Sequence, residues 1–285
     1  MSKVGLVLEG GSLRGLYSSG VLDIMLDNNI EIDCIVGTSA GALFGPNYFS
    51  KQRGRAIRYN KKFCKDRRNI SMLSFILTGN VVNKKFAYYK ITQKYDIFDN
   101  EEFIKSKKEL YATATNIKTA QAEYFKINDV IKDMEKLRAS SAIPILTRPV
   151  KIDNEYYLDG GISDSIPIKK CMSLGCDKVI VVLTQPETYK KEIISNKKIK
   201  AIKLLFKKYP KLIQRILNRH NEYNECVEYI KELEKENKVF VIRPSQHLDI
   251  DLIERNPDKL ENIYQIGIKD MKNKMKDLEK YLNKE

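Results

Sequence analysis

The chain has 285 residues and a mass of 33.0 kDa, with 51 lysines and arginines against 37 aspartates and glutamates, a formal net charge of +14. Apolar residues make up 42% of it, enough for a substantial core, and 14 glycines and 8 prolines exclude a collagen-like or low-complexity chain. No uncharged stretch reaches the roughly 20 apolar residues of a membrane span, no signal peptide is apparent, and five cysteines without a CxxC pair imply neither a disulfide framework nor a metal cage, so we expect a soluble cytoplasmic protein.

The amino-terminal region alternates strands and helices around two glycine-rich loops. A buried strand is predicted at Val4–Leu8 and is followed by the loop 9–15. Apolar residues at helical spacing predict a helix over about residues 13–27. A second strand is predicted at Ile32–Val36, and the loop 37–41 follows it directly.

The rest of the chain continues this alternation and then becomes strongly charged. We expect further strands at Tyr111–Ile117, Glu123–Ile127, Glu155–Leu158, Lys178–Thr184 and Lys238–Arg243, and helices at Ser165–Leu174 and about Pro257–Leu282. This pattern predicts an α/β fold with a largely parallel sheet covered on both faces. We expect a core over residues 1–188, a basic helical insertion or subdomain over 189–237, and a returning strand with a C-terminal helix over 238–285 that completes the domain.

The loop Gly37-Thr38-Ser39-Ala40-Gly41 is a G-x-S-x-G motif between a predicted strand and a helix-compatible segment. A serine on so tight a turn projects its hydroxyl outward, and the flanking glycines avoid clashes of a Cβ with neighbouring backbone. The alternative is an ordinary loop of small residues. The placement favours Ser39 as a nucleophile.

The first glycine-rich loop contains Gly10-Gly11-Ser12-Leu13-Arg14-Gly15. The G-x-G-x-x-G spacing of a dinucleotide site is not met, and no Gly-Lys-Ser/Thr of a P-loop follows. Because loops that follow parallel strands lie at one edge of the sheet, this loop is expected beside Ser39, where its N–H groups could stabilise an oxyanion. Arg14 is either a surface cation or a residue that orders the loop and adds positive potential.

A serine nucleophile needs a base, and the sequence offers two candidates. Asp159 ends a predicted strand and precedes Gly160 and Gly161; burial would raise its pKa above the ordinary value of about 3.9. Asp-Gly is also a common turn pair. His247 would instead complete a Ser39, Asp159, His247 triad in the chain order of the α/β-hydrolases.

The motifs together resemble the patatin-like phospholipases. The family signature is a Gly-Gly-x-x-Arg-Gly loop, Gly-x-Ser-x-Gly, Ala-Ser followed by Pro, and Asp-Gly-Gly, found here at 10–15, 37–41, 139–144 and 159–161. The resemblance covers about residues 4–185. It implies a three-layer α/β/α fold and hydrolysis of lipid acyl esters by a Ser–Asp dyad without metal or cofactor.

The resemblance assigns a role to each matched residue. Ser39 would be the nucleophile and Asp159 the base; Gly10, Gly11 and Ser12 would form the oxyanion loop. The supporting loop residues would be Arg14, Gly15, Gly37, Gly41, Gly160 and Gly161. Ser12 stands where the family usually has a third consecutive glycine; a serine keeps the N–H but disfavours a positive φ.

The positive charge is concentrated in two windows, 51–68 and 193–221, each with nine basic residues and with Asp66 as their single acid. The second window reads as two short basic amphipathic helices separated at Pro210, suited either to core packing or to peripheral contact with an anionic membrane. No nucleic-acid-binding motif is present, so no specific nucleic-acid partner is expected. A non-catalytic protein that binds anionic lipid is the alternative from outside the enzymes.

Overall fold

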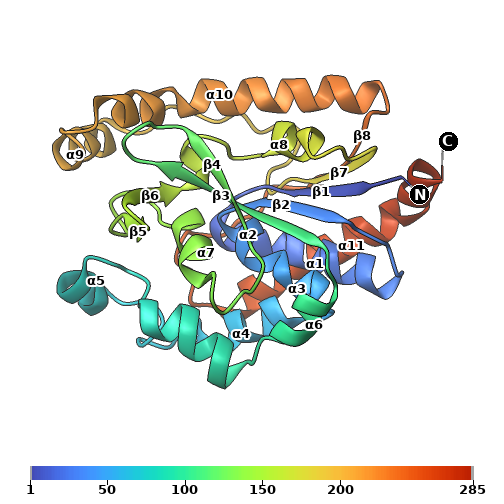
Figure 1. Cartoon of the computed structure of the whole chain (residues 1–285), viewed down its shortest axis with the longest axis horizontal. Coiled ribbons are helices and arrows are strands. Elements are labelled where there is room, and N and C mark those ends of the chain that lie inside the picture. Colours follow the sequence, from blue (N-terminus) through green and yellow to red (C-terminus); the bar gives the residue numbers. More distant parts are fainter. Residues whose placement is uncertain (1, 284–285) are drawn as a thin grey trace.

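A central eight-stranded sheet organises the protein, whose computed structural model describes residues 2–283 (Figure 1). The strand order is β5-β6-β3-β2-β1-β7-β8, and β4 pairs separately with β3. The strands β3, β2, β1, β7 and β8 run parallel, whereas β4 and β6 are antiparallel to β3. The bounds are β1 Val4–Leu8, β2 Cys34–Thr38, β3 Glu109–Asn116, β4 Ala122–Lys126, β5 Val150–Ile152, β6 Glu155–Asp159, β7 Lys178–Val182 and β8 Val239–Ile242.

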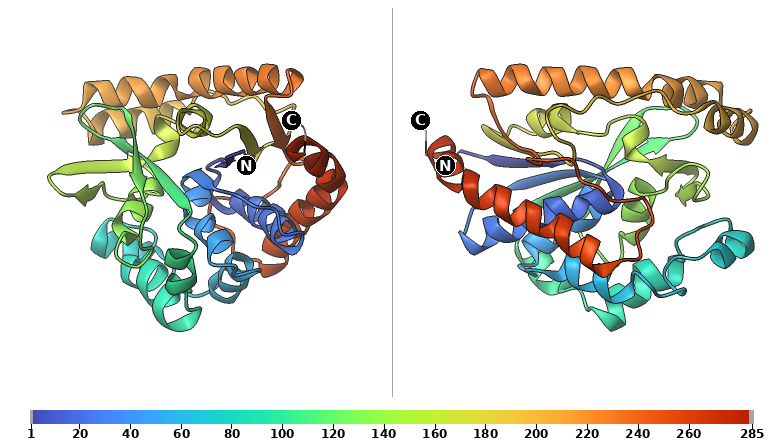
Figure 2. Two further views of the ribbon diagram at one scale, coloured as in Figure 1. Left: turned by 45° about the vertical axis from the view of Figure 1, so that its right-hand side comes forward. Right: turned by 180° about the vertical axis from the view of Figure 1, so that it is seen from behind.

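Helices cover both faces of this sheet, which confirms the expected three-layer α/β/α fold with a mainly parallel sheet (Figure 2). Because side chains alternate along a strand, Leu6 and Leu8 enter the core formed with α1 (Gly15–Asp27) and α11 (Pro257–Leu282). Val7 enters the opposite core, which α8 (Ile168–Ser173) and α10 (Pro210–Lys235) cover.

The register places three loops at one edge of the sheet. Leu8 of β1 lies beside Gly37 of β2, so the loops that follow these parallel strands are neighbours, as expected from the sequence. Asp159 is aligned with Ala114 of β3. Because β6 is antiparallel to β3, Asp159 reaches this edge from the opposite direction.

Several shorter helices surround that edge. A group of helices between β2 and β3, for which no bounds were predicted, lies below the sheet in Figure 1. None of the described helices combines the length and hydropathy needed to cross a bilayer. The remaining elements are η1 Ser12–Arg14, α2 Ala40–Phe44, α3 Pro46–Phe49, α4 Arg55–Phe63, α5 Met72–Thr78, the π-helical η2 Lys85–Tyr95, α6 Asn100–Lys105, α7 Met134–Ser140, η3 Gly160–Ile162 and α9 Asn196–Leu205.

The basic window 193–221 differs from the expected pair of short helices. The first helix, α9, is short, but the second, α10, begins at Pro210 and continues for 26 residues. Proline is compatible with the first turn of a helix because the N–H there has no intrahelical acceptor. The apolar stripe is divided: Ile202, Phe206, Leu212 and Ile216 are buried in a core cluster, whereas Leu204 and Leu205 are exposed.

The packing of α1 against α11 depends on backbone contact at two glycines. A Cβ on Gly267 would lie 2.1 Å from the Tyr17 carbonyl oxygen, and one on Gly20 would lie 2.2 Å from that of Tyr264. Neither clash can be relieved by rotating a side chain, so the helices would have to separate.

We therefore expect Gly267→Ala to lower the free energy of unfolding by about 1–3 kcal/mol, even though alanine has the higher helix propensity. Urea unfolding followed by circular dichroism measures this. Lys269→Ala, at an exposed position of α11, is the control and should change stability by less than about 0.5 kcal/mol. Equal urea midpoints for Gly267→Ala and the unmodified chain would contradict the close approach of α1 and α11 at this glycine.

Candidate active site

Ser39 lies on a sharp turn between β2 and α2. Its φ of 54° and ψ of −116° are unusual for a residue with a side chain, and they agree with the tight turn expected at this motif. A Cβ on Gly41 would lie 2.4 Å from the Leu8 carbonyl oxygen, so the turn can sit against β1 only with a glycine there. A Cβ on Gly15, Gly37 or Gly160 would also come within 2.6 Å of a neighbouring atom.

The Ser39 hydroxyl donates a hydrogen bond of 2.7 Å to Asp159 Oδ2. Both residues are buried, with 6% of each exposed. The other carboxyl oxygen of Asp159 accepts the Gly161 N–H at 2.7 Å. Burial raises the pKa of the Asp159 carboxyl, and the two hydrogen bonds and the positive charge of Arg219 oppose that rise. The arrangement holds one hydroxyl against one carboxylate in a water-poor environment.

The segment 139–144 braces both residues. Ser140 Oγ accepts the Ser39 N–H at 2.9 Å, and the Ala142 carbonyl oxygen accepts the Asp159 N–H at 2.9 Å. Ser140 is fully buried at the end of α7. This segment is the Ala-Ser…Pro block of the sequence, to which the motif alone assigned no role. Its hydrogen bonds hold the Ser39 backbone in place relative to that of Asp159.

The first glycine-rich loop packs directly against Ser39. A Cβ on Gly10 would lie 3.1 Å from the Thr38 carbonyl oxygen and 3.2 Å from Ser39 Cβ. The Gly10 N–H donates to the Ser165 carbonyl oxygen at 3.2 Å. Among residues 2–283, the Gly11 and Ser12 N–H groups have no such acceptor. Ser12 adopts a φ of 53°, the left-handed conformation that glycine adopts more easily.

Two residues of this loop face the C-terminal region. Glu9 is buried and accepts hydrogen bonds from the Thr184 N–H and, at 2.8 Å, from the Tyr223 hydroxyl of α10. Burial raises the pKa of the Glu9 carboxyl. The Nε of Arg14 is buried and, within the described chain, has no hydrogen-bond partner.

Sequence reasoning missed two arginines of α10 that hold the loop after Asp159. Arg219 Nε donates to the Gly161 carbonyl oxygen, and Arg215 donates to the Ser163 carbonyl oxygen at 2.6 Å. They are one helical turn apart, so both point to the same side of α10. That spacing was visible in the sequence, but nothing local indicated which loop the arginines would contact.

Neither histidine contacts the Ser39–Asp159 pair. His247 is exposed in the loop after β8, and His220 Nδ1 lies 3.0 Å from the Leu217 carbonyl oxygen within its own helix. In the described part of the chain, no group of three or more His, Cys, Asp or Glu side chains is placed to hold a metal ion.

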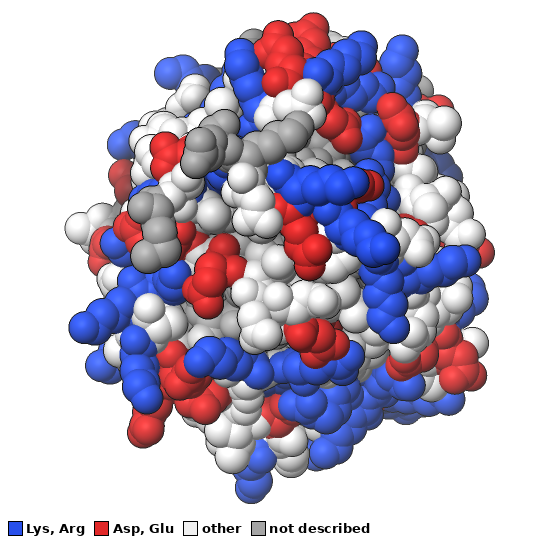
Figure 3. Space-filling view, turned by 90° about the vertical axis from the view of Figure 1, so that its right-hand side faces the viewer, with Lys and Arg blue, Asp and Glu red and all other residues white. Residues whose placement is uncertain are grey.

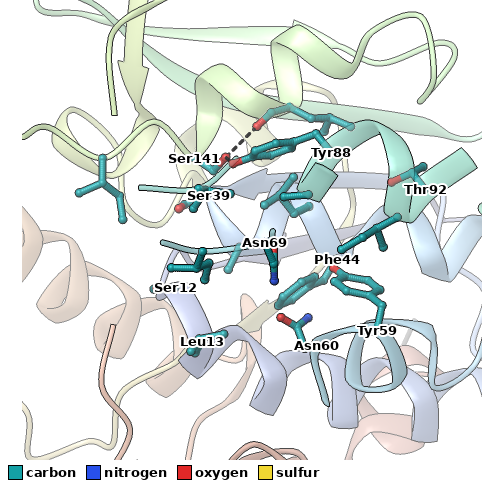
Figure 4. Close-up of a pocket in the computed structure, with 18 of the residues that line it drawn as sticks. Ser12, Leu13, Ser39, Phe44, Tyr59, Asn60, Asn69, Tyr88, Thr92 and Ser141 are labelled. Carbon is teal, nitrogen blue, oxygen red and sulfur yellow. Dashed lines mark hydrogen bonds between the residues drawn. The ribbon is translucent and has the colours of Figure 1, made fainter. Parts of the chain in front are cut away.

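A cavity of about 210 Å³ opens beside the Ser39 hydroxyl. Ser12 and Ser39 lie at the same side of it, and Phe44, Tyr59 and Thr92 lie farther along it (Figure 4). A hydrogen bond of 3.0 Å joins two polar groups of its wall, Tyr88 and Ser141. The rest of the wall is mainly apolar, including Leu13, Leu43, Ile70, Val81, Val82, Ala87, Ile91, Phe98, Met134, Leu137, Ile143, Leu146, Leu252 and Ile253.

The chain is similar in sequence to two groups of curated proteins. The chain is 30% identical over 188 residues to the uncharacterised protein YjjU of Escherichia coli, an alignment covering 65% of this chain and 52% of YjjU. It is 29% identical over 184 residues to lysophospholipase nte1 of Emericella nidulans, covering 63% of this chain and 12% of that protein. The alignments thus span about half of YjjU and a small part of nte1.

A solved structure, that of VipD from Legionella pneumophila, aligns with a TM-score of 0.44 at 13% identity, covering 95% of this chain and 66% of VipD.

Two family models match separate parts of the chain. One, for a domain of unknown function (DUF6363), matches residues 209–283, which include α10, β8 and α11. The other, for patatin-like phospholipases, matches residues 6–172 and so includes Ser39, Asp159 and the first glycine-rich loop. The chain belongs to the patatin-like phospholipase family.

Proposed function

We propose that the protein hydrolyses acyl esters of lipids through a Ser39–Asp159 dyad. The observation that carries the proposal is the buried 2.7 Å hydrogen bond between the Ser39 hydroxyl and a carboxylate whose pKa is raised by burial. A carboxylate with a raised pKa is a stronger base than an ordinary aspartate and accepts the serine proton more readily. Membership of the patatin-like phospholipases and similarity to a lysophospholipase support a lipid substrate.

In the acylation step, Ser39 Oγ attacks the ester carbonyl carbon while its proton passes to Asp159 Oδ2. The N–H groups of Gly11 and Ser12 hold the oxyanion of the tetrahedral intermediate; the Gly10 N–H is already donated to Ser165, so the predicted set of three donors is reduced to two. When the intermediate collapses, the carbon–alkoxide bond breaks and the leaving alcohol takes the proton from Asp159.

Deacylation repeats these roles with water. Asp159 accepts a proton from a water molecule, whose oxygen attacks the acyl carbonyl. The bond between that carbon and Ser39 Oγ then breaks, Ser39 Oγ regains the proton, and a fatty acid leaves. The mechanism uses no cofactor.

The apolar cavity beside Ser39 is suited to an acyl chain, because methylene groups gain by leaving water for a wall of this kind. The exposed lysines of α9, at 197, 198, 200 and 203, are suited to peripheral contact with anionic lipid. We therefore place the substrate at a membrane surface. The proposal gives the protein no specific nucleic-acid partner.

We expect Ser39→Ala and Asp159→Asn each to lower kcat for a short-chain nitrophenyl ester by at least about 10³-fold, because one removes the nucleophile and the other the base. His247→Gln tests the triad alternative and should retain wild-type kcat. Circular dichroism of the folded variants serves as the control. Turnover near wild type in Asp159→Asn, or its loss in His247→Gln, would refute the dyad; an inactive but lipid-binding wild type would favour the non-catalytic alternative.

The raised pKa of Asp159 predicts the pH dependence. Asp159 must be ionised to accept the proton, so kcat/KM should fall as the pH drops through a pKa above the ordinary value of about 3.9. The charge of Arg219 lowers the pKa of Asp159, so Arg219→Gln should shift the acid limb of the profile of kcat/KM against pH to higher pH. Arg215→Gln, which removes a contact to the same loop, is the control and should leave the limb in place. An unmoved limb in Arg219→Gln would contradict the electrostatic role.

A larger side chain in the cavity should change the preference for chain length. Ala87 is half-buried and lines the wall, so Ala87→Phe should lower kcat/KM for a dodecanoyl ester at least about tenfold more than for a butanoyl ester. Competition between the two nitrophenyl esters measures the ratio. The exposed substitution Lys269→Ala should leave it unchanged. Equal losses for both esters would indicate that the cavity does not hold the acyl chain.

A further inference from the structure

A short helix, α5, presents an apolar surface to solvent. The four large apolar side chains Met72, Leu73, Ile76 and Leu77 are 70%, 64%, 74% and 72% exposed. Single exposed apolar residues are common on proteins, whereas four on one seven-residue helix form a continuous patch. Figure 1 and the right-hand view of Figure 2, which look at the protein from opposite sides, show α5 standing away from the body of the protein.

The helix is a defined element. Ser71 Oγ accepts the Ser74 N–H at 3.0 Å as an N-terminal cap, and Gly79 ends the helix with a φ of 73°. Two backbone hydrogen bonds pair the segments that lead into and out of it: Ser71 N–H to the Val81 carbonyl oxygen and Asn83 N–H to that of Asn69. The apolar surface is therefore carried at the tip of a paired stem.

The base of that stem forms part of the cavity wall at Ser39. Asn69, Ile70, Val81 and Val82 line the cavity together with Ser39. Val81 N–H also donates to the Leu146 carbonyl oxygen, in a loop that lines the cavity on another side. The stem thus joins the exposed helix to the wall of the cavity that Ser39 lines.

Exposed cations that precede and follow the α5 stem in the sequence indicate what the patch contacts. The exposed cations Lys65 and Arg67 precede the helix and Lys85 follows it, and none of the three has an ion-pair partner within residues 2–283. The basic helix α9 lies toward the same end of the molecule (Figures 1 and 2). On the face at the opposite end of Figure 1, acidic and basic side chains are interspersed (Figure 3).

We propose that α5 inserts its four apolar side chains into the surface of an anionic bilayer and so brings the cavity mouth to the lipid. Apolar side chains bordered by cations are the composition of peripheral membrane segments, since the apolar part enters the acyl region while the cations remain at the anionic headgroups. A lipid acyl chain then passes from the bilayer along the stem into the cavity without crossing water. This inference rests on the proposed function for its purpose but not for its test.

The absence of tryptophan from the chain allows a direct measurement. The variant Ile76→Trp carries its single tryptophan on α5, and Ile97→Trp carries one at another exposed apolar site, 65% exposed. With vesicles of phosphatidylcholine and phosphatidylglycerol, Ile76→Trp fluorescence should shift to shorter wavelength and be quenched by brominated acyl chains. Ile97→Trp fluorescence should do neither.

Charged substitutions test the consequence for binding and turnover. Leu73→Glu/Ile76→Glu should lower the vesicle partition coefficient at least about tenfold, whereas the matched control Ile97→Glu/Ile104→Glu should stay within about twofold of wild type. The ratio of hydrolysis of vesicle lipid to hydrolysis of a soluble ester should fall with the first pair only.

Three results would overturn the insertion of α5. The first is vesicle binding by Ile76→Trp without a change in its fluorescence spectrum. The second is no vesicle binding by the wild-type chain. The third is a blue shift of Ile76→Trp that appears without lipid as the protein concentration rises, because it would indicate that a second copy of this chain covers the patch. A wild-type protein that binds vesicles through α5 yet hydrolyses no ester would refute the proposed function and leave the insertion standing.

Discussion

The candidate active site depends on one hydrogen bond, from Ser39 Oγ to Asp159 Oδ2, between residues 120 positions apart. Burying an ionised carboxylate is unfavourable unless hydrogen bonds compensate, and here the serine hydroxyl and the Gly161 N–H supply them. The surrounding backbone is arranged to keep this pair together. Residues 140 and 142 bond to the two partners, and Gly160 allows the turn to lie against β3, where a Cβ would be 2.2 Å from the Thr113 carbonyl oxygen.

Much of this site could be predicted because its residues stand at strand ends. A G-x-S-x-G after a buried strand and a glycine loop after a parallel neighbour must lie at one edge of a sheet, and the register of Leu8 with Gly37 confirms this. The direction of β6 could not be predicted, since a short strand looks the same whether it pairs parallel or antiparallel. Ser12 adopts a positive φ although serine disfavours it; the sequence marked the position, since the family usually has a glycine there, but the intrinsic preference of serine did not indicate this conformation.

The burial of apolar side chains could not be predicted from their spacing in two segments of the chain. The basic window 193–221 was predicted as two short amphipathic helices, suited either to core packing or to a membrane; Ile202, Phe206, Leu212 and Ile216 are buried, whereas Leu204 and Leu205 are exposed. The segment 72–77 is mainly apolar in sequence and yet exposed in the structure. Its sequence, Met-Leu-Ser-Phe-Ile-Leu, is as apolar as a core helix, and only its position at the tip of a stem exposes it. Periodicity identifies which side chains share a face but not what covers that face.

The electrostatics of the site extend beyond the part matched by the patatin-like model. That match ends at residue 172, whereas Arg219 and Tyr223 belong to α10, inside the region 209–283. Tyr223 donates to buried Glu9 at the start of the first glycine-rich loop, and Arg219 bonds to the loop after Asp159 and opposes the rise of the Asp159 pKa. Burial makes Asp159 a stronger base, and too large a rise would leave it protonated and unable to accept a proton. Because one charge of α10 offsets part of that rise, the proposed mechanism gives the C-terminal region a part in setting the pH range over which Asp159 can accept a proton.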